Sequence, residues 1–292
     1  MDFGPLLIQS NHLMHSSDFD HWFPFPLDES SPEMVFGIQV LKQCEPLLVA
    51  TESQARELQI KKAQAAESLG DYFQACTDSQ TAQLLAVRYL RAKHPELSCV
   101  ADDQPALLSL ALQIQEDLVI LEGTSPHRLI AGAVFFPSGW SIADKIGQSL
   151  QETHSVVPRF EHTLQRQTDR LVTHLKLDRP VWRMNWGVRP SDQLDQSPKW
   201  STMIAESAKQ VDATNAGTSC FFRVERQTLS RLPDSGAILF TIHTRQWPLV
   251  ALDKKQFKHL YQTLRNCPDE TLIYKGIAAF HDPLIRFLEK ML

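Results

Sequence analysis

The spacing of apolar and polar residues predicts helices in the first part of the chain. Apolar positions recur with a helical period over residues 51–68, 79–94 and 105–113. Thr51 is followed three residues later by Gln54, which resembles a capping box and therefore a helix start. The preceding segment is rich in proline and aromatic residues, so we expect it to pack on the body as an ordered arm.

From residue 117 onward the pattern predicts strands. Five strands are expected, at residues 117–121, 129–136, 181–186, 220–226 and 237–244. The first two flank the turn-rich segment 122–126 (EGTSP), which is a hairpin signal. Helices are expected between and after the strands, at residues 142–150, 160–175, 199–211, 253–265 and 283–292.

This order of elements predicts an α+β fold. Two strands, a helical excursion and three further strands are the order of a PAS-like, five-stranded antiparallel sheet. In such a sheet the excursion helices cross one face and bury a ligand beneath them. We therefore divide the chain into an N-terminal arm and helical region (1–114), a PAS-like core (115–250) and C-terminal helices (251–292).

Composition and charge narrow the class of protein. A hydrophobic content of 43% in 292 residues supports a real core, and a formal net charge of -5 argues against a nucleic-acid-binding protein. No apolar run approaches the roughly 18 residues of a membrane span, and the N-terminus lacks the basic segment of a secretory signal. The five cysteines form no CxxC pattern, which argues against a zinc site, an iron–sulfur cluster or a disulfide framework and favours a reducing cytoplasm.

Five ordered motifs carry a resemblance to a known family. They are 115–119 (QEDLV), 131–140 (AGAVFFPSGW), 145–158 (KIGQSLQETHSVVP), 179–186 (RPVWRMNW) and 222–233 (FRVERQTLSRLP), with 274–276 (YKG) near the end. Together they resemble the α subunit of the heme-dependent oxidative N-demethylase family. One departure is Phe136, which stands where the family has a cysteine.

The resemblance implies a PAS-like fold that binds heme b. It also implies that O2 is activated to remove a methyl group from a small secondary amine such as dimethylamine, with release of formaldehyde. In this family, partner subunits carry flavin and an iron–sulfur cluster. The chain itself has no G-x-G-x-x-G loop and no cluster-binding cysteine set, so we expect its electrons to come from such a partner.

His154 is the leading candidate for the axial ligand of the heme iron. It lies in the excursion between the second and third strands, and a neutral imidazole is a common iron ligand. The alternative is a helix-terminal histidine that makes only a structural hydrogen bond. His162, His174 and His243 are rival ligands, whereas Cys220 and Cys267 lack the loop context of a thiolate ligand.

Basic residues are candidates for the heme propionates, because the guanidinium fork matches a carboxylate. Arg226 shares a strand face with Phe222 and Val224, so it needs an anionic partner, either a propionate or a nearby carboxylate. Weaker candidates for the cofactor site are Lys145, Arg183, Arg231 and Trp140.

The substrate site is expected to combine one carboxylate with aromatic walls. Glu225 is the candidate catalytic residue, as a receptor for a protonated amine or as a proton relay; a cross-strand ion pair is the alternative. Phe135, Phe136, Trp186 and His243 are candidates for its lining, although such aromatics more often belong to a core. A non-catalytic PAS-type heme sensor is the rival function.

Overall fold

The computed structural model of the chain describes residues 37–99, 103–155 and 165–292. These residues form an α+β protein around one seven-stranded antiparallel sheet, in the order β1-β5-β6-β7-β3-β4-β2. The strands are β1 Gln39–Val40, β2 Phe73–Ala75, β3 Asp117–Leu121, β4 Leu129–Ala133, β5 Val181–Arg189, β6 Phe221–Arg231 and β7 Ile238–Pro248. Five strands were predicted, and that number is wrong because β1 and β2 each add a short strand at an edge.

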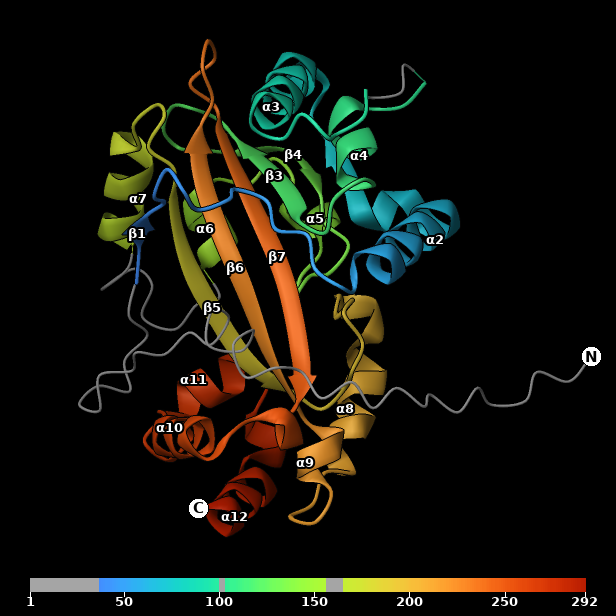
Figure 1. The fold of residues 1–292 in the computed structure, drawn as a ribbon, viewed down its shortest axis with the longest axis vertical. Coiled ribbons are helices and arrows are strands. Elements are labelled where there is room, and N and C mark those ends of the chain that lie inside the picture. Colours follow the sequence, from blue (N-terminus) through green and yellow to red (C-terminus); the bar gives the residue numbers. More distant parts are fainter. Residues whose placement is uncertain (1–36, 100–102, 156–164) are drawn as a thin grey trace, which may run out of the picture.

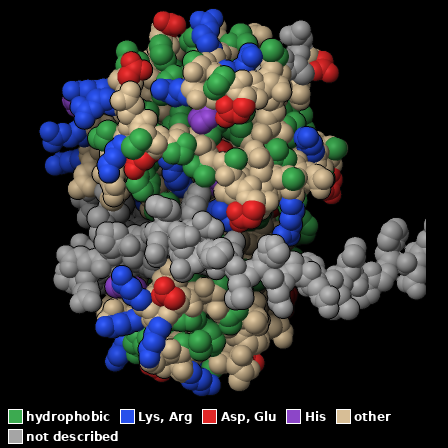
Figure 2. Space-filling view, in the orientation of Figure 1, with side chains coloured by type: hydrophobic (Ala, Val, Ile, Leu, Met, Phe, Trp, Pro, Cys, Tyr) green, Lys and Arg blue, Asp and Glu red, His purple; other side chains and the backbone are tan. Residues whose placement is uncertain are grey.

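Helices lie at both ends of the long strands β5, β6 and β7 and behind them (Figure 1). They are α2 Gln54–Tyr72, α3 Gln80–Lys93, α4 Ala106–Ala111, α5 Ile142–Lys145, α6 Leu150–His154, α7 Gln165–His174, α8 Ser201–Lys209, α9 Ala216–Ser219, α10 Lys254–Arg265, α11 Asp269–Tyr274 and α12 His281–Met291. Within the described part of the chain, no helix has the length and apolar character needed to cross a membrane. On the face seen in Figure 2, basic and acidic side chains are interspersed.

The excursion between β4 and β5 differs from its prediction. One helix was expected over 142–150, but Ile146 is extended (ψ 135°) and Gly147 has φ +78°, so α5 ends and α6 starts anew at Leu150. A capping box formed by Ser149 and Glu152 defines that new start. The helix expected over 160–175 is α7, whose first predicted residues, with His162, lie outside the described residues.

Alternation along the strands gives the sheet two buried faces. Leu229 of β6 packs with Leu150 of α6 and Val172 of α7; we call this side the excursion face. Phe222 and Val224 point the other way, into a core with the C-terminal helices, and we call that side the opposite face. The opposite face of β3 and β4 packs on α3 and α4. The ligand that we predict from the sequence would lie on the excursion face, between the sheet and the excursion helices.

The first described residues pair with the sheet and pack on its core. β1 pairs with β5, and Leu47 and Leu48 are buried in the core beside α3 and α4. Residues 1–36, to which the rest of the predicted arm belongs, lie outside the described residues. The division of the chain into three regions stays a prediction, although β1 and β2 join the sheet of the central one.

Candidate functional site

Strand register gathers polar side chains on the excursion face of β5 and β6. Asn185 pairs with Glu225, Gly187 pairs with Arg223, and Arg183 pairs with Gln227. Because side chains at paired positions point to the same face, these residues form one polar patch in the middle of the sheet. The patch lies on the face that α6 covers.

His154 ends α6 and is half-buried next to this patch. Its Nδ1 donates a hydrogen bond to the Leu150 carbonyl at 2.8 Å, so the neutral ring carries its lone pair on Nε2. Burial lowers the pKa of His154, and the positive charges of Arg183 and Lys145 lower it further. The imidazole is therefore neutral at pH 7, the form that binds a metal.

The hydrogen bond alone does not identify a metal ligand. His174 at the end of α7 makes the same bond, from Nδ1 to the Arg170 carbonyl at 2.8 Å, but its side chain is exposed. What distinguishes His154 is its burial and the two cations that act on it, Arg183 on β5 and Lys145 on α5.

Glu225 lies at the centre of the polar patch and is buried. Its Oε2 accepts hydrogen bonds from Asn185 Nδ2 at 3.3 Å and from Gln227 Nε2 at 3.0 Å. Its Oε1 lies 3.7 Å from Arg223 Nε, an ion-pair distance that is too long for a hydrogen bond. The carboxylate is thus held in place by neighbours on β5 and β6.

Three cations near Glu225, the buried Arg223 and Lys275 and the half-buried Arg189, were not singled out as site residues from the sequence. Arg223 is 2% exposed, and burial lowers its pKa to about 10. Burial also lowers the pKa of Lys275, to about 8, and that of Arg189. Alternation along β6 does place Arg223 beside Glu225, and continuing the same alternation along β5 from Arg183 would have reached Arg189.

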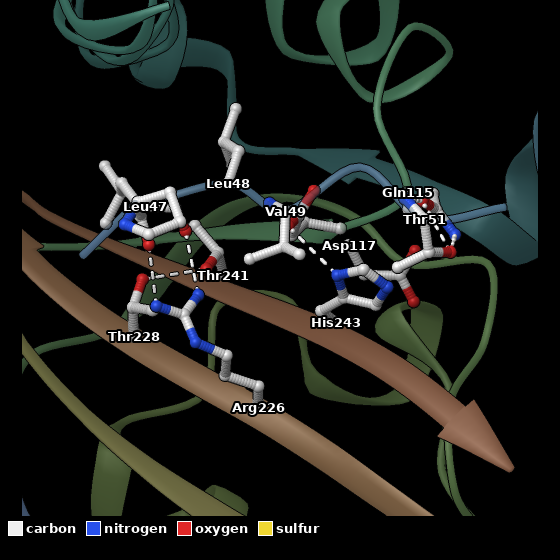
Figure 3. A network of polar contacts seen from close by, with 12 residues as sticks. Leu47, Leu48, Val49, Thr51, Gln115, Asp117, Arg226, Thr228, Thr241 and His243 are labelled. Atoms are coloured by element: carbon white, nitrogen blue, oxygen red, sulfur yellow. Dashed lines mark hydrogen bonds and ion pairs between the residues drawn. The ribbon is translucent and has the colours of Figure 1, made fainter. Parts of the chain in front are cut away.

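Arg226 and His243 lie on the opposite face, away from His154. They are paired residues of β6 and β7, and the Arg226 guanidinium donates to the carbonyls of Leu47 (3.1 Å) and Pro46 (2.7 Å), as Figure 3 shows for Leu47. His243 Nδ1 lies 3.2 Å from Glu116 Oε1 in full burial. The expectation that these two residues line the same pocket as His154 is not met, because the sheet separates them.

The remaining candidates are also divided among different surroundings. Phe135 and Phe136 are buried in the core next to Tyr72 and Lys61, not at the polar patch. Trp186 points to the opposite face, where it stacks on Phe222, and Trp140 packs on the excursion side. Arg231 donates to the carbonyls of Val172, Thr173 and Leu175 at the end of α7 and to those of Gly123 and Gly236.

A family model matches residues 43–285, and its description reads "Haem-dependent oxidative N-demethylase, alpha subunit-like". The chain belongs to this family. The match covers most of the chain. It includes the excursion, the polar patch and every strand of the sheet except β1. The resemblance drawn from the sequence is confirmed, and the family description names a heme-dependent oxidoreductase subunit that works with other subunits.

The donors of the excursion face fit the heme that the demethylase family is named for. Among the described residues no group of three or more His, Cys, Asp or Glu side chains is arranged to hold a metal ion. A heme iron does not need such a group, because the porphyrin supplies four nitrogens and the protein adds an axial ligand. His154 would supply Nε2 to the iron, and the basic residues Lys145 and Arg183 beside it would pair with the acid groups of heme.

Proposed function

We propose that this chain is the heme-binding subunit of an oxidative N-demethylase that acts on a small secondary amine of about the size of dimethylamine. The observation that carries the proposal is the state of the His154 side chain in a chain that belongs to this family. His154 is a half-buried, neutral histidine whose Nδ1 donates a hydrogen bond to a backbone carbonyl. A metal-bound histidine usually donates its other ring N–H to a carboxylate, a backbone carbonyl or water.

The cofactor in this proposal is heme b, which supplies the O2 chemistry that protein side chains cannot perform. His154 would hold the iron through Nε2, while Lys145 and Arg183 would pair with the propionates. Trp140, packed on the same side of the sheet, would contribute to the wall of the site. Arg226 and Arg231 are not included, because backbone carbonyls already occupy their guanidinium groups.

Glu225 is the residue that we assign to the amine. A fixed carboxylate on the excursion face accepts a hydrogen bond from a secondary ammonium group and orients its methyl group. The overall reaction consumes the amine, O2, two electrons and two protons. It yields the demethylated amine, formaldehyde and water. Glu225 is also placed to pass protons into the site.

The order of the predicted strands supports a PAS-like core. Within the seven-stranded sheet, the five expected strands follow one another as β5-β6-β7-β3-β4, so the first of them, β3, pairs with the last, β7. The helices α5, α6 and α7 leave between β4 and β5 and cover one face. This is the arrangement in which a ligand is buried between a sheet and its excursion.

Electrons must reach this subunit from another chain. The sequence has no dinucleotide-binding glycine loop and no cysteine set for a cluster, so we propose partner subunits that carry flavin and an iron–sulfur cluster. In the isolated heme-loaded protein, dithionite should reduce the iron and NAD(P)H should not. Rapid reduction by NAD(P)H alone would contradict this division of labour.

The visible spectrum of the purified protein tests the heme assignment. We expect a Soret band that His154→Ala reduces by more than about tenfold per folded molecule. His174→Ala is the matched control, because it removes the same Nδ1–carbonyl bond at an exposed position. If the Soret band is absent, or if both variants keep full heme, His154 is not the ligand.

A further inference from the structure

We propose that one water molecule, bound between Arg189, Arg223 and Glu225, delivers solvent protons to Glu225. This inference rests on the proposed function, in which each turnover consumes two protons, and it names the route by which they arrive. It follows from the size of a small void on the excursion face, from the donors and acceptors around that void, and from their charge.

The void has room for a single water. Its volume is about 10 Å³, and it is lined by residues of β5 and β6 together with Ser138. A space of this size holds one water if the water finds two to four polar partners. The void is not closed on all sides, so a water bound there can exchange protons with solvent.

Two guanidinium groups supply the donors. Arg189 and Arg223 line the void, and the Nε atoms of both are buried without a hydrogen-bond partner among the described residues. The far ends of both forks are already fixed. Arg189 donates to the Lys275 carbonyl at 2.6 Å and to Ser138 Oγ at 2.8 Å, and Arg223 donates to the Phe136 carbonyl at 2.7 Å. Buried N–H groups rarely stay without an acceptor, and an internal water is a common one.

Glu225 supplies the acceptor. It lines the same void, and its Oε1 lies 3.7 Å from Arg223 Nε, which is too long for a direct hydrogen bond. A polar contact of this length is one that a bridging water can join. A water here accepts from the two Nε–H groups and donates to Glu225 Oε1, and its second proton can go to Ser138 Oγ. A chloride ion could accept from the arginines but has no proton to give to the carboxylate, so water fits these partners better.

The surrounding charge makes this water a good proton donor. Glu225 interacts electrostatically with four cations, which are Arg183, Arg189, Arg223 and Lys275. Positive charge stabilises the negative charge that develops on a water oxygen as its proton leaves, most of all where N–H groups are aimed at that oxygen. In each transfer one O–H bond of the water breaks and one forms at Glu225 Oε1. The water then regains a proton from solvent, and no electrons move.

Gly187→Ala removes the room for this water without touching its partners. Gly187 lines the void and pairs with Arg223 across the strands. Apart from its neighbours in the chain, a Cβ on Gly187 would meet only Arg189 Nε, at 4.0 Å, so a methyl group fits there and takes the place of one water. Gly70→Ala in α2, where the new methyl would meet only Gln74 Nε2 at 3.9 Å, is the matched control.

Two measurements on the heme-free protein test the site. A crystal structure that shows ordered waters should have one peak within hydrogen-bond distance of both Nε atoms and of Glu225 Oε1 in wild type and in Gly70→Ala, and none in Gly187→Ala. By NMR, the Nε–H protons of Arg189 and Arg223 should exchange with D2O at least about tenfold more slowly in Gly187→Ala than in wild type. A void without a peak, unchanged exchange, or an anomalous peak in crystals grown in bromide, which would show an anion, overturns the inference.

Formaldehyde release by the heme-loaded protein tests the proton route. With O2, dimethylamine, and ascorbate plus a soluble redox dye as the electron donor, Gly187→Ala should react at least about tenfold more slowly than wild type, with an unchanged spectral response to the amine. Hydrogen peroxide brings its own electrons and protons, so with peroxide in place of O2 the two proteins should react at equal rates. Equal rates under both conditions would make the water purely structural, and a loss under both would mean that Gly187 shapes the substrate site; either result overturns the route. Failure of the proposed function would appear separately, as a missing Soret band.

Discussion

Lys61 of α2 and Asp117 of β3 form an ion pair in the interior, with 3.0 Å between Nζ and Oδ1 and with both side chains at most 1% exposed. Asp117 Oδ2 also accepts the backbone N–H of Phe136 at 2.8 Å. The Phe136 carbonyl in turn accepts a hydrogen bond from Arg223. The pair therefore anchors the turn after β4 that positions one wall of the polar patch.

Removing one member of this pair should destabilise the fold strongly. Lys61→Met leaves a buried carboxylate without its cation, for which we expect a loss of about 3–5 kcal/mol in the free energy of unfolding. The double variant Lys61→Met with Asp117→Asn removes both charges and keeps an acceptor for Phe136, so it should recover part of the loss. Urea unfolding measures both variants, and a cost below about 1 kcal/mol for Lys61→Met would contradict the ion-pair role.

The fold was predictable where the local pattern is strong. β3 has the bounds expected from the apolar run Asp117–Leu121. β4 ends at Ala133 although the apolar run continues to Phe136, because the N–H of Val134 turns to the Tyr72 carbonyl and that of Phe136 to Asp117. Such tertiary acceptors leave no local signal. The same holds for β1 and β2, which are too short to show alternation.

The site was predictable within a strand but not between elements. Alternation along β6 correctly grouped Arg223, Glu225 and Gln227 on one face. It also set Arg226 on the other face, but it could not show that the Pro46 and Leu47 carbonyls would meet its charge. A sequence does not reveal which distant backbone carbonyls a buried cation will find, so either a propionate or a nearby carboxylate was expected as the partner of Arg226.

Arg231 is a second cation that backbone carbonyls hold, and its role can be tested. Its guanidinium caps the C-terminal carbonyls of α7, so Arg231→Gln should cost about 2–3 kcal/mol of stability while the heme content of the folded protein stays unchanged. Thermal unfolding and the heme-to-protein ratio measure the two effects, with the exposed Arg179→Gln as control. Loss of heme at unchanged stability would instead support the propionate role expected from the sequence.

Glu225→Gln tests the assignment of the amine. The substitution removes the negative charge but keeps an acceptor for Asn185 and Gln227, so the strands should pair as before. We expect the spectral response of the ferric protein to N-methylated amines to weaken by at least about tenfold. Glu206→Gln on the surface is the control, since its carboxylate pairs with Lys209 at an exposed position. An unchanged titration in Glu225→Gln would remove this residue from the site.

Lys275 should make the stability of the fold depend on pH above neutrality. Its Nζ donates to the Trp186 carbonyl at 2.7 Å and lies 4.7 Å from the centre of the Trp186 ring, inside the protein. Burial lowers its pKa from 10.5 to about 8. Between these two values the unfolded chain holds the proton and the folded chain does not. Stability contributed by this group therefore rises with pH from about 8 to 10.5.

The comparison of wild type with Lys275→Met isolates this contribution. Buried cysteines such as Cys220, whose pKa is raised to about 12, act in the opposite direction, but they are common to both proteins. We expect the stability difference, wild type minus variant, to become more positive with pH by up to roughly 1.4 kcal/mol per unit within that window. Urea unfolding at a series of pH values between 7 and 10 measures it, with the exposed Lys255→Met as control. Parallel pH curves for wild type and Lys275→Met would mean that the amine of Lys275 reaches solvent, and the positive charge at the Glu225 end of the sheet would then be screened rather than buried.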